Sequence, residues 1–127
     1  MGESKPTLVV AVVEDDAPLR KALGRLLSAR GFEPALFESA EAYIDASPAP
    51  LCIVLDVRLP GMSGIELQHR LRAAGAAPPI IVTTASHEAA ICERAQQNGC
   101  AGFFRKPVDA RALITTIAAL ADPSSRG

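Results

Sequence analysis

Three short runs of almost uninterrupted apolar and β-branched residues constrain the fold of this chain more than any other feature. They are Leu8 to Val13 (LVVAVV), Leu51 to Leu55 (LCIVL) and Ile80 to Thr84 (IIVTT). A strand with one solvated face alternates apolar and polar residues, whereas a continuous run is typical of a strand covered on both faces. The runs therefore predict a parallel sheet between two layers of helices. Two weaker runs, Glu33 to Phe37 and Ala101 to Phe104, bring the predicted strands to five.

Segments with helical patterns separate these runs. A helix is expected around Pro18, which suits a first helical turn, and another after Ser63-Gly-Ile-Glu66, which forms a capping box. Asp109 can cap a last helix, and the segments from Ser39 to Asp45 and from His87 to Asn98 show weaker patterns. The alternation predicts a (βα)5 α/β fold, a doubly wound five-stranded parallel sheet with the flavodoxin-like order 2-1-3-4-5.

A length of 127 residues fits one domain, which we assign to residues 8–121. Residues 1–7 are interpreted as an N-terminal tail, and residues 122–127 as a C-terminal tail or the start of a linker. Thirteen basic and fourteen acidic residues offer no overall field for nucleic acid or an anionic membrane. The chain has no apolar stretch of membrane-spanning length, no signal-peptide pattern at its start, and three cysteines without a C-x-x-C pair. These features predict a cytoplasmic protein whose function comes from a local site.

Polar side chains gather where the predicted strands end. In open α/β sheets, ligands bind beyond the carboxyl ends of the strands, so side chains from several strands converge there. The residues at these ends are Glu14, Asp15, Asp16, Asp56, Thr83, Thr84 and Lys106. Each of them alone is more typical of a turn, a helix cap, a β-former or a solvated charge. Together they predict a site.

The residue types at this edge indicate phosphoryl chemistry. Clustered carboxylates raise one another's pKa unless a cation lies among them, and carboxylate oxygens suit Mg²⁺. A carboxylate can also act as a nucleophile toward phosphorus. The phosphoryl oxygens then need countercharge and hydrogen-bond donors, which Mg²⁺, a lysine and a hydroxyl group supply.

The segment Asp56-Val-Arg-Leu-Pro-Gly-Met-Ser-Gly64 resembles the phosphoacceptor segment of the receiver domains of two-component response regulators. Glu14-Asp15 is similar to the acidic pair of that family, Thr84 to its hydroxyl position, and Lys106-Pro107 to its Lys-Pro pair. The spacings fit the family, and the resemblance runs from about Leu8 to Leu120. The segments 18–23 and 37–43 resemble the subgroup that carries a helix-turn-helix output domain.

The resemblance implies that Asp56 accepts a phosphoryl group from a histidine kinase, while Thr84 and Lys106 hold the phosphoryl oxygens. It also implies a set of Mg²⁺ ligands: Glu14 (directly or through water), Asp15, Asp56 and the backbone carbonyl of Arg58. The chain would then be no enzyme, because it promotes only its own phosphorylation and dephosphorylation.

Phe103 occupies the position of the family's switch aromatic, three residues before Lys106. Strand alternation predicts that it points away from Lys106, toward the last two helices, although a plain core role is the alternative. By the resemblance, Thr84 and Phe103 shift together on phosphorylation. They would reshape the face made by the helix over 87–98, the strand over 101–104 and the helix after Asp109. This face would meet a downstream effector domain or protein, or a second copy of the chain, with no direct binding to nucleic acid or membranes.

The chain departs from the family pattern in two places. The acidic pair begins with Glu14 where Asp is commoner, and Val108 stands where the family often has Phe. The Lys106-Pro107 bond is often cis in this family, and the sequence permits that form without requiring it.

Three other functions are alternatives to a phosphorylated receiver. A degenerate receiver would act only as a docking module. A phosphotransferase of the haloacid-dehalogenase type needs a second Asp two positions after the first, where this chain has Arg58. A nucleotide-binding module is rejected because the chain has no Gly-rich phosphate loop. The two histidines are expected outside the main chemistry, His69 on a solvated helix face and His87 at the start of a helix near the site.

Overall fold

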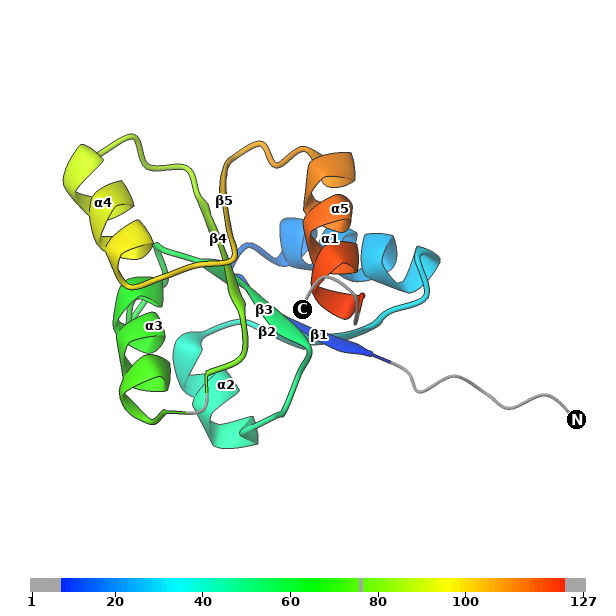
Figure 1. Ribbon diagram of the computed structural model, residues 1–127, viewed down its shortest axis with the longest axis horizontal. Helices are drawn as coiled ribbons and strands as arrows, with labels where there is room; N and C mark the ends of the chain where they lie inside the picture. Colours follow the sequence, from blue (N-terminus) through cyan, green and yellow to red (C-terminus); the bar gives the residue numbers. More distant parts are fainter. Residues whose placement is uncertain (1–7, 76, 123–127) are drawn as a thin grey trace, which may run out of the picture.

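The computed structural model describes residues 8–75 and 77–122 (Figure 1). Within them, five parallel strands form one sheet in the order β2-β1-β3-β4-β5, as predicted. The strands are β1 Val9–Val13, β2 Glu33–Phe37, β3 Cys52–Asp56, β4 Ile80–Thr84 and β5 Gly102–Arg105. The predicted N-terminal tail, residues 1–7, lies outside the described residues. The same holds for residues 123–127 of the predicted C-terminal tail.

Helices cover both faces of the sheet, because the central strands are apolar on both sides. The helices are α1 Ala17–Ala29, α2 Ala40–Ala46, α3 Gly64–Ala73, α4 Ala89–Gln97 and α5 Ala110–Ala121. Buried residues of α1 and α5 pack in one cluster with one face of the strands, and those of α2, α3 and α4 pack in a second cluster with the other. Figure 1 shows α1 and α5 together on one side of the sheet. All residues of β3 and β4 are buried, which explains their continuous apolar runs.

Both predicted helix caps form. The Ser63 Oγ accepts a hydrogen bond from a backbone N–H of the first turn of α3, at 3.1 Å, and Asp109 Oδ1 accepts one at the start of α5, at 3.2 Å. Asp16 occupies the N-cap position of α1, but its side chain makes no capping bond. No helix in the described part of the chain is long and apolar enough to cross a bilayer.

The expectation that His87 opens a helix is wrong. The N-cap of α4 is Glu88 and the helix begins at Ala89, so His87 lies in the preceding loop. The Glu88 side chain makes no capping bond, because it pairs with Arg58 across the loop after β3, at 2.6 Å. Gln68, a buried residue of α3, holds the other end of α4. Its Nε2 donates to the backbone carbonyls of Ala95, in the last turn of α4, and Gly99, after the helix, each at 2.9 Å.

Candidate functional site

The turn after β1 places one buried and two exposed carboxylates at the edge of the sheet. Glu14 is 2% exposed, whereas Asp15 and Asp16 are exposed. The turn is held in two ways: the Asp16 N–H donates to Glu14 Oε2 at 3.1 Å, and Arg20 Nη1 donates to the Glu14 carbonyl at 2.8 Å. The direction of the Glu14 side chain is thus fixed in part by the backbone N–H of Asp16.

Asp56 ends β3 at the same edge, with 4% of its surface exposed. Its Oδ1 accepts a hydrogen bond from the Arg58 N–H at 3.2 Å. The residue that lets α3 begin beside it is Gly64, whose N–H donates to the Val57 carbonyl at 2.8 Å. A Cβ at Gly64 would collide with the backbone carbonyl of Asp56 and lie 2.9 Å from the Cα of Val57. Glycine at this position therefore allows the helix to start against the strand.

Lys106 closes the site from the end of β5. Its backbone N–H donates to the Thr84 carbonyl at 2.8 Å, and its peptide bond to Pro107 is cis. The Lys106 Nζ donates to Glu14 Oε1 at 2.6 Å and to Asp56 Oδ2 at 3.0 Å. The sequence prediction that these three residues converge is confirmed, with the ammonium group placed between the two carboxylates.

Burial and neighbouring charges shift the protonation equilibria of this cluster. Burial raises the pKa of Glu14 from 4.5 to about 7, against the hydrogen bonds from Lys106 and the Asp16 backbone, and the charge of Asp56 adds to the rise. Burial acts to lower the pKa of Lys106, but its hydrogen bonds to Glu14 and Asp56 outweigh this effect and raise it. The charged form of Glu14 thus depends on a nearby cation.

The donor set fits a hard divalent cation. Glu14, Asp15 and Asp56 each offer a carboxylate oxygen, and these oxygens all lie within 4.8 Å of one another. Oxygen ligands of this kind suit Mg²⁺, which takes only one or two carboxylates and keeps several waters. Since Asp15 is exposed, the cluster is reachable from solvent.

Thr84 is fully buried, and its Oγ1 accepts a hydrogen bond from the Ser86 N–H at 2.9 Å. The register pairs Thr83, rather than Thr84, with Asp56. Because side chains alternate along a strand, the two threonines lie on opposite faces of the sheet. Thr84 shares its face with Val82, which packs in the cluster of α2, α3 and α4.

Phe103 is half-buried and packs against the same cluster as Val82. The prediction that it points away from Lys106 agrees with this face. The expected contact with both of the last two helices is only half right, because the buried residues of α5 belong to the other cluster. There they pack with Phe104. Alternation predicts the side of the sheet correctly but does not tell which helices cover it.

Sequence reasoning missed the polar contacts of the loop between β4 and α4. Arg105 Nη1 donates to the Ser86 carbonyl at 2.9 Å and contacts His87 Nδ1 at 3.1 Å. Ser86 Oγ accepts from the Glu88 N–H at 3.1 Å, and Glu88 in turn pairs with Arg58. The only available signal was Ser86 just before the weak helical pattern, which is typical of a helix start.

Comparisons with known proteins agree on one family. A family model described as the response regulator receiver domain matches residues 10–118. The transcriptional regulatory protein FixJ of Azorhizobium caulinodans is 40% identical over 122 residues, covering 94% of this chain and 56% of that protein. FixJ of Bradyrhizobium diazoefficiens is 34% identical, covering 92% of this chain and 60% of that protein. The chain therefore spans little more than half the length of these relatives.

Solved structures give the same result. The FixJ-N crystal structure matches with a TM-score of 0.82 and 29% identity, over 92% of this chain and 95% of that one. The response regulator StyR matches with a TM-score of 0.80 and 38% identity, over 89% of this chain and 58% of that one.

Proposed function

Because this chain belongs to the response regulator receiver domain family, we propose that it is a phosphorylation-dependent signalling receiver. In this proposal Asp56 accepts a phosphoryl group from a histidine kinase. The observation that carries the proposal is the bridge from Lys106 to Asp56 and Glu14, which joins residues 50 and 92 positions apart at one edge of the sheet. A receiver domain is a signalling module rather than a catalytic enzyme.

The proposed reaction is a direct transfer to the carboxylate of Asp56. One Asp56 oxygen forms the new O–P bond while the P–N bond of a phosphohistidine breaks, and the imidazole nitrogen of the donor keeps the electron pair. The Arg58 N–H, which donates to Asp56 Oδ1, supports this role because it holds the carboxylate in one orientation. The small exposure of Asp56 limits the hydration of its carboxylate.

We propose that the Mg²⁺ ligands are Asp15, Asp56, Glu14 directly or through water, and the backbone carbonyl of Arg58. When bound, the ion would supply countercharge to the carboxylates and to the phosphoryl oxygens. Glu14 must then hold its negative charge, although burial raises its pKa to about 7. Proton loss from Glu14 is therefore part of metal binding in this proposal.

Lys106 and Thr84 hold the phosphoryl oxygens in the proposed product. The Lys106 ammonium group exchanges its bond to Asp56 Oδ2 for one to a phosphoryl oxygen, which keeps the same charge pairing. The Thr84 hydroxyl accepts from the Ser86 N–H, so its own proton is free to be donated to the phosphoryl group. A move of Thr84 toward the phosphoryl group would weaken its bond to Ser86 and alter the loop before α4.

We propose that Thr84 and Phe103 form the switch and that it changes the face made by α4, β5 and α5. Phe103 packs on the side of the sheet covered by α4, which supports this coupling. The partners would be a histidine kinase and an effector domain or protein, or a second copy of the chain. Since two longer relatives, covered by this chain over 60% and 56% of their length, are transcriptional regulatory proteins, we propose that residues 8–121 are the receiver domain of such a regulator. Three free cysteines fit a cytoplasmic location.

The test is phosphorylation by acetyl phosphate, and binding of beryllofluoride, with and without Mg²⁺. We expect one phosphoryl group on the wild-type protein by intact mass, none on Asp56→Asn, and wild-type behaviour for Asp45→Asn, an exposed control on α2. Amide shifts on adding beryllofluoride should be larger at Phe103 and α4 than at α2. Equal behaviour of wild type and Asp56→Asn would refute the phosphoacceptor role, and leave a docking module. Turnover of a phosphate ester would instead favour a phosphotransferase.

A further inference from the structure

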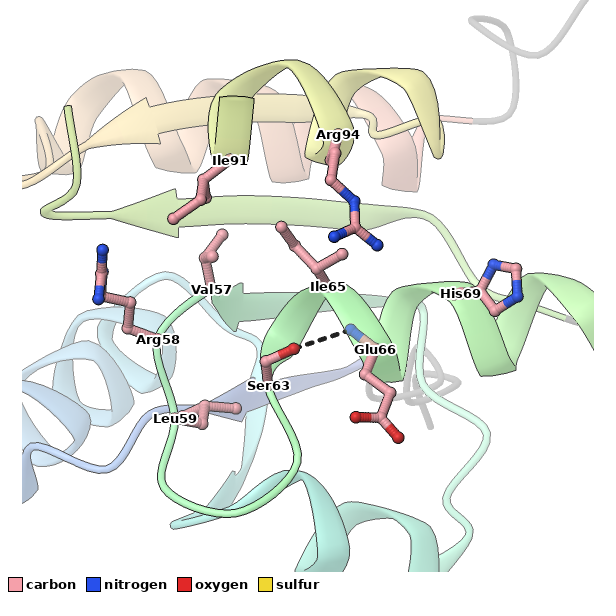
Figure 2. Close-up of a pocket in the computed structure, with 9 residues that line it drawn as sticks. All are labelled: Val57, Arg58, Leu59, Ser63, Ile65, Glu66, His69, Ile91 and Arg94. Atoms are coloured by element: carbon pink, nitrogen blue, oxygen red, sulfur yellow. Dashed lines mark hydrogen bonds between the residues drawn. The ribbon is translucent and has the colours of Figure 1, made fainter. Parts of the chain in front are cut away.

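A groove between α3 and α4 opens beside the acidic site, and the proposed signalling chemistry does not use it. It has a volume of about 560 Å³, which lies in the range of small-molecule sites in proteins. Figure 2 shows that α3 and α4 form its two walls and that the loop between β3 and α3 closes one end. The groove is a candidate site because of its size and because two separate elements line it.

The floor of the groove is apolar. Val57 directly follows β3, Ile65 comes from the first turn of α3 and Ile91 from α4. Val57 and Ile65 are buried, and Ile91 is half-buried between them and solvent. These branched side chains offer a surface for an aliphatic or aromatic body of a few carbon atoms.

One end of this floor carries an unpaired positive charge. The Arg94 side chain extends from α4 into the groove, and the Glu66 carboxylate points away from it (Figure 2). Glu66 is paired with Arg70 at 3.4 Å and Glu88 with Arg58 at 2.6 Å. Among the described residues, Arg94 makes no ion pair and its guanidinium makes no hydrogen bond, so the groove has a cation in excess.

We propose that this groove binds a small amphipathic carboxylate. The apolar body packs on Val57, Ile65 and Ile91, and the carboxylate pairs with the Arg94 guanidinium, whose planar donors suit that group. His69, exposed on α3 and lining the same groove, supplies a second donor. The binding does not require phosphorylation of Asp56.

The experiment titrates ¹⁵N-labelled protein with 4-phenylbutyrate and, separately, with its neutral analogue 4-phenylbutanamide. We expect saturable amide shifts confined to α3, α4 and the loop after β3. The amide should bind about tenfold more weakly, because it lacks the charge-assisted hydrogen bond to Arg94. Shifts that do not saturate, or equal affinity for acid and amide, would overturn the proposal.

Variants separate this site from the rest of the molecule. Arg94→Gln should weaken 4-phenylbutyrate binding about tenfold, while Arg94→Lys keeps part of it. The matched control Arg111→Gln, at an exposed position of α5, should bind as wild type does. Asp56→Asn should also bind normally, so a failure of the phosphoryl proposal leaves this one testable. Unchanged affinity in Arg94→Gln would overturn it, as would binding of an acidic amphipathic peptide in the absence of 4-phenylbutyrate binding.

Discussion

Replacing Lys106 with methionine removes the ammonium group and keeps an apolar stem of similar length. The Nζ lies 2.6 Å from Glu14 Oε1 and 3.0 Å from Asp56 Oδ2. At an effective dielectric constant of about 20, each pair has a gross attraction of roughly 6 kcal/mol. The net loss is smaller, because the lysine no longer has to be desolvated and Glu14 can bind a proton. Removing one partner of a buried ion pair costs roughly 3–5 kcal/mol. Because the Lys106 side chain is 20% exposed, we expect the free energy of unfolding to fall by about 3 kcal/mol near pH 8.

The pH dependence follows from the raised pKa of Glu14. The pKa of Glu14 is about 7 in the folded protein, whereas its ordinary value is 4.5. The folded state therefore binds the Glu14 proton more tightly than the unfolded state does. The contribution of the Glu14 proton to stability is therefore fully present below pH 4.5 and is lost as the pH rises through about 7. Lys106→Met removes a hydrogen bond that lowers this pKa, so the pKa rises further. The variant should therefore lose less stability near pH 5 than near pH 8.

The assay is the free energy of unfolding in urea at both pH values, with and without Mg²⁺. A loss of about 3 kcal/mol corresponds to a Tm lower by about 10 °C for a chain of this size. Mg²⁺ should restore part of it, because a cation again lies among the carboxylates. Lys21→Met, an exposed control on α1, should change little. An equal loss at both pH values with no effect of Mg²⁺ would refute the electrostatic reasoning and assign the cost to packing of the stem.

Three further outcomes are expected. Gly64→Ala should lower the free energy of unfolding by about 3 kcal/mol, because the new methyl group meets backbone atoms at the end of β3 that cannot move aside. The control Gly75→Ala, which has open space around it but a positive φ, should lower it by only about 1 kcal/mol. Gln68→Leu should cost about 2 kcal/mol, since two backbone carbonyls lose their donor, and amide exchange should speed up in α4 more than in α1. Mg²⁺ affinity measured by calorimetry should rise between pH 6 and pH 8 as Glu14 loses its proton, and Glu14→Gln should abolish that rise; a parallel rise in the variant would contradict the assignment.

The sheet was predictable because burial on both faces leaves a direct mark on the sequence. The residues of β3 and β4 are all buried, and both strands were expected within a residue of their observed bounds. The start of α4 was not predictable, because its segment has one large aliphatic residue, Ile91, and no capping side chain. Where the helical periodicity is this weak, tertiary contacts decide at which residue the helix begins.

The convergence of Glu14, Asp56 and Lys106 was predictable for a topological reason, since parallel strands end at a common edge. The contact of Arg58 with Glu88 was not, because it joins two loops separated by 30 residues. Nothing in local sequence sets the distance between such loops. The contact of Arg105 with Ser86 has the same origin, since it depends on how the loop before α4 folds back over the end of β5.

The bond network of Lys106 ties the end of an edge strand to two other strands. Lys106 follows β5, while its carboxylate partners follow β1 and end β3. If a protein that grips the end of β5 moves Lys106, thermodynamic reciprocity requires that this protein and a ligand competing for the ammonium group change each other's affinity by the same factor. The pKa of Glu14 would then respond to the position of Lys106, so a proton titration would report the docking of a protein that never touches a carboxylate.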